Sequence, residues 1–136
     1  MGRTFQTLTK TEVIEINRRM IKEFGGIFFA GNDNLLNPGA LDFLIVTIEG
    51  RLLDFDPYPT IFEKAALSAW RIIKGHIFID GNKRTGMESC RLLLDINGYE
   101  LLVDRDVVDT ALQIAKNEIE FTDFVEWLRN RASGQE

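Results

Sequence analysis

Helix-starting and helix-ending residues divide this chain into short amphipathic segments. This pattern restricts the possible folds more than any other feature of the sequence. The first segment is the clearest, because Thr9 and Glu12 form a capping box and Gly25-Gly26 ends the helix. Asn37-Pro38 can begin a second helix. Further helices are expected to begin near residues 59, 82, 104 and 122. Short connections favour antiparallel packing, so we predict an all-α fold, a compact bundle of about six helices.

Apolar residues recur at helical spacing in these segments, which indicates one buried face on each helix. The expected stripe of the first helix is Val13, Ile16, Met20 and Phe24. The expected inward residues of the fifth helix are Val107, Val108, Ala111, Leu112 and Ala115. Since the chain has 136 residues and 45% of them are hydrophobic, we predict a single domain over residues 1–136, with a core from about 8 to 130 and a frayed tail at 133–136.

The connection between the third and fourth helices concentrates the chemically active side chains. It contains His76, which is the only histidine of the chain, and Asp80. Histidine can take a proton from a hydroxyl group near neutral pH, so His76 is the candidate general base. A single carboxylate together with nucleotide phosphates is a common way of binding Mg²⁺, so Asp80 is the candidate metal ligand.

The residues that follow Asp80 are suited to binding phosphate. Gly81 lets the backbone pass close to an anion, and Asn82 can hold either the loop or a phosphate oxygen through its side-chain amide. Lys83 and Arg84 add positive charge at the N-terminus of the fourth helix, where free N–H groups already favour anions. Phe78 carries no chemistry and is expected to anchor the loop in the core.

Each of these residues also has a purely structural interpretation. His76 can satisfy the last carbonyl groups of the third helix, and either Asp80 or Asn82 can cap the fourth. Lys83 and Arg84 can be solvated surface charges. It is the combination and spacing of these residue types that favours a site for transferring a phosphate-containing group to a hydroxyl.

The same residues resemble the motif of the Fic/Doc superfamily, which reads H-x-F-x-D/E-G/A-N-G/K-R. Every fixed position is matched, from His76 to Arg84. Lys83 stands where AMP-transferring members usually have glycine, and Met87 stands where they have a second arginine. Both departures are similar to the Doc (death on curing) branch of toxin–antitoxin systems. The resemblance covers most of the chain, from about residue 8 to 128.

The resemblance implies a Doc-like toxin that transfers the γ-phosphate of ATP, with Mg²⁺, to a serine or threonine of a target protein. It makes His76 the catalytic residue, Asp80 the metal ligand and Asn82, Lys83 and Arg84 phosphate-binding residues. Elongation factor Tu is the implied target, and arrest of translation is the implied outcome. Two alternatives remain: a Fic-type AMP-transferase and a non-enzymatic module that binds an antitoxin.

The resemblance also implies two protein-binding surfaces. A short flap before the third helix, which can form a β-hairpin, would bind the target as an added strand. Its residues are Arg51, Leu52, Leu53, Asp54, Phe55 and Asp56. We find no internal inhibitory-helix motif, so inhibition is expected from a small antitoxin that binds in trans, and an exposed apolar groove is predicted to receive it.

Composition excludes several other partners and environments. The formal net charge is −5, which argues against direct nucleic-acid binding. No apolar run approaches the ~20 residues that a membrane span requires, so no membrane association is expected. The first residues lack a secretory signal, and the single cysteine, Cys90, cannot form an internal disulfide. A cytoplasmic location is therefore expected, with Cys90 as a small core residue.

Overall fold

The computed structural model describes residues 5–50 and 54–134. Within these ranges the chain forms six α-helices, which confirms the predicted all-α fold. They are α1 (Lys10–Phe24), α2 (Pro38–Glu49), α3 (Ile61–Gly75), α4 (Asn82–Asp95), α5 (Arg105–Ala115) and α6 (Phe121–Arg131). The smaller elements are the 3-10 turn η1 (Ala30–Asn32) and the strands β1 (Tyr99–Glu100) and β2 (Ser133–Gly134).

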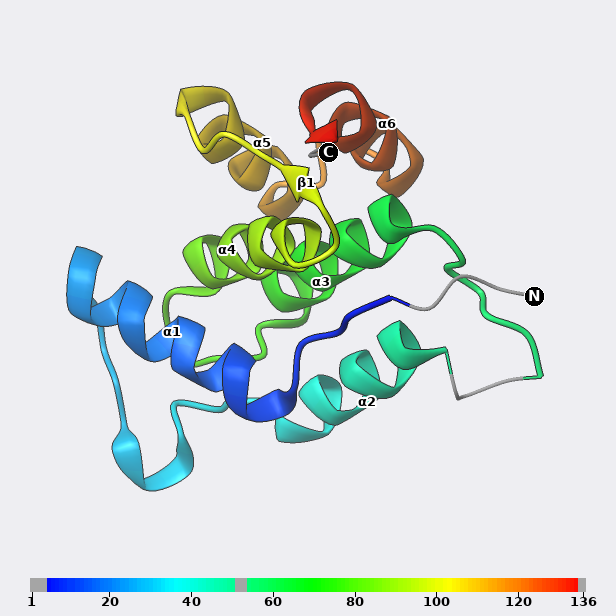
Figure 1. Ribbon diagram of the computed structural model, residues 1–136. Coiled ribbons are helices and arrows are strands. Elements are labelled where there is room, and N and C mark those ends of the chain that lie inside the picture. The colour runs from blue at the N-terminus through cyan, green and yellow to red at the C-terminus, as the bar shows by residue number, and fades with distance from the viewer. Residues whose placement is uncertain (1–4, 51–53, 135–136) are drawn as a thin grey trace.

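Helices α3 and α4 form the centre of the molecule. In Figure 1 they lie side by side, with α1 and α2 on one side and α5 and α6 on the other. Gly86 allows this close approach, because a Cβ atom there would lie 2.8 Å from a side-chain carbon of Ile73 and 3.1 Å from the carbonyl oxygen of Ala69. The loop that joins α3 to α4 therefore begins and ends on two tightly packed helices.

The helix boundaries follow the local capping chemistry. The capping box of Thr9 and Glu12 is present, and Thr60 caps α3 by accepting a hydrogen bond from the backbone N–H of Glu63. The last helix begins at Phe121, after Glu120, and not after Thr122 as predicted. This earlier start places Phe121 in the helix, and its side chain packs against the core.

A two-stranded antiparallel sheet closes the C-terminal end of the described chain. Tyr99 pairs with Gly134, and Glu100 pairs with Ser133. Residues 133 and 134 thus form a strand, whereas the sequence analysis assigned them to a frayed tail. Their backbone pairing with β1 depends on residues more than 30 positions earlier in the chain, which composition alone does not reveal. None of the helices in the described ranges is long and apolar enough to cross a membrane.

The described part of the predicted flap contains no strand. Arg51, Leu52 and Leu53 lie outside the described residues, and residues 54–60 form bends and coil. Phe55 is 66% exposed, whereas Asp56 forms an ion pair with Lys64, which is only 3% exposed. Asp56 also accepts a hydrogen bond from the backbone N–H of Tyr58, so this segment is tied to α3.

Ala115 and three larger side chains that were predicted to face the core from α1 and α5 are exposed. Phe24 is 52% exposed, Val108 is 59% exposed and Leu112 is 41% exposed. Helical spacing identified their face correctly as apolar, but that face is wider than the neighbouring helices cover within the described chain. The three larger side chains line a surface groove instead.

Candidate active site

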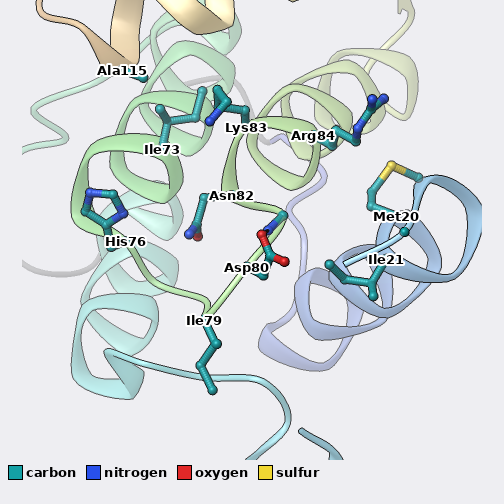
Figure 2. Close-up of a pocket in the computed structure, with 12 residues that line it drawn as sticks. Met20, Ile21, Ile73, His76, Ile79, Asp80, Asn82, Lys83, Arg84 and Ala115 are labelled. Carbon is teal, nitrogen blue, oxygen red and sulfur yellow. Dashed lines mark hydrogen bonds between the residues drawn. The ribbon is translucent and has the colours of Figure 1, made fainter. Parts of the chain in front are cut away.

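Six of the predicted site residues, from His76 to Arg84, meet around one pocket of about 350 Å³ between α1 and the loop joining α3 to α4, whereas Phe78 and the described flap residues 54–56 do not line it. His76, Asp80 and the first turn of α4 line it, together with Met20 and Ile21 from α1. Figure 2 shows His76 and Asp80 on either side of Asn82, with Lys83 and Arg84 projecting from the helix that begins there. Gly81, Asn82, Lys83 and Arg84 are all among the lining residues.

His76 directly follows α3 and has a left-handed backbone, with φ of 46°. Gly75 is the last helical residue of α3, and the histidine that follows it makes the turn. Asn37 supports this conformation, because its side-chain Nδ2 donates to the carbonyl oxygens of Gly75 at 2.9 Å and His76 at 3.0 Å. The imidazole side chain lies at the exposed edge of the pocket.

The next residues fasten the loop to the core. Ile77 and Phe78 are completely buried. The carbonyl oxygen of Ile77 accepts hydrogen bonds from the backbone N–H groups of Leu36 (2.8 Å) and Asn37 (3.0 Å), and Ile79 N–H donates to the carbonyl oxygen of Asn34 (2.8 Å). Backbone hydrogen bonds on both sides of Phe78 thus attach the loop to the segment before α2.

Asn82 locks the loop onto the start of α4. Its Oδ1 accepts from the backbone N–H of Phe78 at 2.9 Å, and its Nδ2 donates to the Phe78 carbonyl oxygen at 2.8 Å. The structure thus shows the predicted use of this amide in holding the loop. Neither Asp80 nor Asn82 is the helix cap, since Gly81 occupies that position with φ of 77°.

Gly81 is required by both conformation and space. Its positive φ is a conformation that residues with a Cβ atom rarely adopt. A Cβ atom there would also lie 2.8 Å from a methyl carbon of Ile21. The backbone of the loop consequently passes against α1, and the side chain of Asp80 is directed toward the end of that helix (Figure 2).

The carboxylate of Asp80 is oriented by backbone donors from two segments. Its Oδ2 accepts from the N–H of Ile27 at 2.9 Å, and its Oδ1 accepts from the N–H of Gly81 at 2.8 Å. A carboxylate has about four acceptor sites, so acceptor capacity remains on both oxygens. In the described ranges no three His, Cys, Asp or Glu side chains gather as a metal cluster. One oriented carboxylate fits Mg²⁺ that is otherwise held by nucleotide phosphates and water, and does not fit a cation that requires a full protein cage.

Lys83 and Arg84 are exposed cations on the first turn of α4. The guanidinium carbon of Arg84 lies 3.9 Å from the ring centroid of Phe24, at the end of α1. The first intrahelical bond recorded at this end joins Thr85 N–H to the Gly81 carbonyl oxygen, so the preceding N–H groups have no acceptor within the helix. Positive charge and free backbone donors therefore coincide at the pocket.

A larger groove of about 710 Å³ adjoins this pocket, and Lys83 and Arg84 line both. It lies among α1, α4, α5 and the segment before α5, and its apolar lining includes Phe24, Val108 and Leu112. The groove also contains exposed residues of that preceding segment, namely Leu102 (70%) and Val103 (56%). The predicted apolar groove is thus present beside Lys83 and Arg84.

Helix α4 also carries an ion pair that lines the groove. Arg91 contacts Glu88 through two hydrogen bonds, Nε to Oε1 at 2.7 Å and an Nη atom to Oε2 at 2.9 Å. The hydrogen-bonded carboxylate of Glu88 raises the pKa of the Arg91 guanidinium. Met87 also lines the groove and brings no charge.

Two residues that hold the loop of the candidate site were not predicted from the sequence. Asn17 and Asn34 are completely buried behind the loop and connect it to α1 and to the segment before α2. The available signal was the position of Asn17, four residues after Val13 and three before Met20, on the buried face of α1. A polar residue on such a face needs a buried partner. Asn34 gave no comparable signal, because it lies in a polar turn.

Fold and pocket together define a class of protein: a helical domain with a cationic pocket on the loop between its two central helices. Residues 7–94, more than half of the chain, match the family model described as "Fic/DOC family". The chain therefore belongs to the Fic/DOC family. Its predicted resemblance to the Doc branch is confirmed by two curated relatives.

The first relative is a Toxin Doc from Mycolicibacterium smegmatis, which is 32% identical over 92 residues. That match covers 68% of this chain and 71% of the relative. The second is the Protein kinase doc of Escherichia phage P1, which is 26% identical over 122 residues, or 90% of this chain and 92% of the relative. The likeness to the phage protein thus extends over nearly the whole chain.

Proposed function

We propose that this chain is a Doc-like toxin that transfers the γ-phosphate of ATP to a serine or threonine hydroxyl of a target protein. The observation that carries the proposal is the convergence of His76, Asp80 and the cationic start of α4 on one pocket. The name of the phage relative, Protein kinase doc, supports a kinase activity. Arrest of translation through elongation factor Tu is the outcome we expect from the resemblance.

In the proposed mechanism the phosphates of the donor lie at the start of α4. The N–H groups of its first turn, Lys83 and Arg84 balance the negative charge of the phosphates. Asp80 would hold Mg²⁺, which when bound neutralises charge on the transferring group and fixes its orientation. His76 would accept the proton of the attacking hydroxyl, which can approach because the imidazole lies at the exposed edge of the pocket.

Asn82 and Phe78 contribute by holding the loop that carries His76 and Asp80. Because Asn82 bonds both the N–H and the carbonyl of Phe78, the backbone between His76 and Asp80 is held against the start of α4. Catalysis of phosphoryl transfer depends mostly on positioning and charge stabilisation. A loop that is anchored in the core and locked at the helix start meets this requirement.

Transfer of AMP is the alternative reaction of the same pocket. It requires the donor to present its α-phosphate to the hydroxyl. Met87 cannot supply the positive charge that the second arginine gives to AMP-transferring relatives, and Lys83 replaces their glycine with a bulky cation. Both substitutions favour the kinase reaction.

The experiment uses ATP labelled on either the γ-phosphate or the α-phosphate. Each donor is incubated with Mg²⁺, cell lysate and either the wild-type protein or His76→Ala. Label transferred to protein from the γ position by the wild type alone is the expected result. Transfer from the α position would instead establish AMP transfer, and absence of transfer from both donors would leave the antitoxin-binding module as the better interpretation.

We also propose that an antitoxin segment covers the groove among α1, α4 and α5. The groove presents apolar side chains, of which Leu102, Val103 and Val108 are more than half exposed. Burying such surface is the main driving force for a segment that folds on binding. Because Lys83 and Arg84 line both the groove and the pocket, a bound segment would also obstruct the donor phosphates.

This interaction is tested by changing the groove without changing the pocket. Val108→Asp should retain the toxicity of the wild type but escape neutralisation when the antitoxin is co-expressed. Asp109→Ala, on the same helix but outside the groove lining, is the matched control and should still be neutralised. Neutralisation of Val108→Asp as effective as that of the wild type would contradict this assignment.

A further inference from the structure

Asn17 and Asn34 form a completely buried polar pair that the proposed chemistry does not use. The side chain of Asn34 donates to that of Asn17 through an Nδ2–Oδ1 hydrogen bond of 3.0 Å. Both residues are 0% exposed. Burying two carboxamides is unfavourable unless their hydrogen bonds are satisfied, so this pair has a specific set of partners.

Asn17 connects α1 to the candidate metal ligand. Its Nδ2 donates to the backbone carbonyl oxygen of Asp80 at 2.9 Å and to the hydroxyl oxygen of Thr85 at 3.0 Å. These two acceptors lie before and after the start of α4. One side chain of α1 therefore fixes both the backbone at Asp80 and the first turn of the helix that follows it.

Asn34 holds the segment that faces the Asp80 carboxylate. Its Nδ2 donates to the carbonyl oxygen of Ile27 at 3.0 Å, and its Oδ1 accepts from the N–H of Phe29 at 3.0 Å. The N–H of Ile27 in turn donates to Asp80 Oδ2. The position of this donor thus depends on the two bonds that Asn34 makes on either side of Phe28.

From these contacts we infer that Asn17 and Asn34 are positioning residues that orient the Asp80 carboxylate for Mg²⁺ bound with ATP. The inference rests on the proposed function, in which Asp80 is the metal ligand. Asn17 sets the main chain of Asp80, and Asn34 sets the Ile27 donor that restricts rotation of its side chain. Groups that orient a metal ligand typically change metal affinity by about 10–100-fold when removed.

The test compares Asn17→Ala and Asn34→Ala with the wild type. Mg²⁺ is titrated into protein saturated with a non-hydrolysable ATP analogue, and binding is followed by calorimetry. Both variants should bind Mg²⁺ at least about tenfold more weakly. Transfer activity should recover when Mg²⁺ is raised, because the ligand itself remains in place. Unchanged Mg²⁺ affinity in folded variants would overturn the inference.

Asn97→Ala is the matched control. The side chain of Asn97 likewise makes three hydrogen bonds, all of them to the main chain, two with Gln6 and one with Leu93, but at the opposite end of α4. It should lower the melting temperature without altering Mg²⁺ affinity. If Asn97→Ala weakens Mg²⁺ binding as strongly as the other two variants, the effect is a general loss of stability and the inference fails.

A further variant leaves both asparagines in place, although its new Cβ atom would also lie 2.8 Å from a methyl carbon of the buried Ile21. A Cβ atom on Gly26 would lie 2.8 Å from Asp80 Oδ2, so Gly26→Ala should displace the carboxylate directly and weaken Mg²⁺ binding. If neither asparagine variant folds, this substitution decides, and unchanged affinity in it overturns the inference. Asp80→Ala tests the proposed function separately from the positioning role of the asparagines. Wild-type Mg²⁺ affinity in that variant would refute Asp80 as the metal ligand.

Discussion

Replacing Phe78 with alanine tests how the loop is anchored. The ring is completely buried, so the substitution removes its contacts and leaves a cavity that the surrounding side chains fill only in part. Such a change lowers the free energy of unfolding by about 3–5 kcal/mol. With an unfolding entropy of about 2.1 cal/mol/K per residue, 136 residues give roughly 0.29 kcal/mol/K, so the melting temperature should fall by about 10–17 °C.

The assay is thermal unfolding followed by circular dichroism, with urea unfolding as a second measure of the free energy. Phe55→Ala is the control, because that ring is 66% exposed and its removal should change the free energy of unfolding by less than about 0.5 kcal/mol. Equal melting temperatures for Phe78→Ala and the wild type would refute the anchoring role of the ring.

Three further substitutions or treatments have definite expected outcomes. Gly81→Ala should lower the free energy of unfolding by about 1–3 kcal/mol in urea titrations, because its Cβ atom would collide with Ile21; a neutral effect would contradict the tight packing described for the loop. Asp56→Ala should lower the free energy of unfolding by about 3 kcal/mol, because it leaves the buried ammonium group of Lys64 unpaired. Lys64→Met should lower it less, because an unpaired Asp56 can turn to solvent; the reverse order would refute this reasoning. Burial raises the pKa of the Cys90 thiol, so the reactive thiolate is scarce, and Ellman's reagent at pH 8 should label the protein only after unfolding; rapid labelling of the native protein would show that Cys90 is accessible.

The sequence predicted the features that depend on local chemistry. The capping box at Thr9 and the helix start at Asn82 follow from residues close together in the chain, and both are present. Grouping His76 with Asp80 was possible for the same reason, since only four positions separate them. The family resemblance then added a reaction that spacing alone could not specify.

The features that depend on distant contacts could not be predicted in this way. The partners of Asn17 lie 17, 63 and 68 residues further along the chain, so nothing local identifies them. The exposure of Phe24 and Val108 has a similar origin, because periodicity identifies an apolar face but not what covers it. The left-handed turn at His76, where a glycine was available next to it, likewise depends on the support of Asn37.

The most direct test of the central claim is to identify the chemical group that this protein adds to its target. A labelled acceptor protein is purified from lysate treated with ATP and Mg²⁺, digested and analysed by tandem mass spectrometry. We expect a serine or threonine that carries one phosphoryl group after treatment with the wild type and is unmodified after treatment with His76→Ala. An AMP group on that residue, or the same phosphorylation by His76→Ala, would contradict that claim.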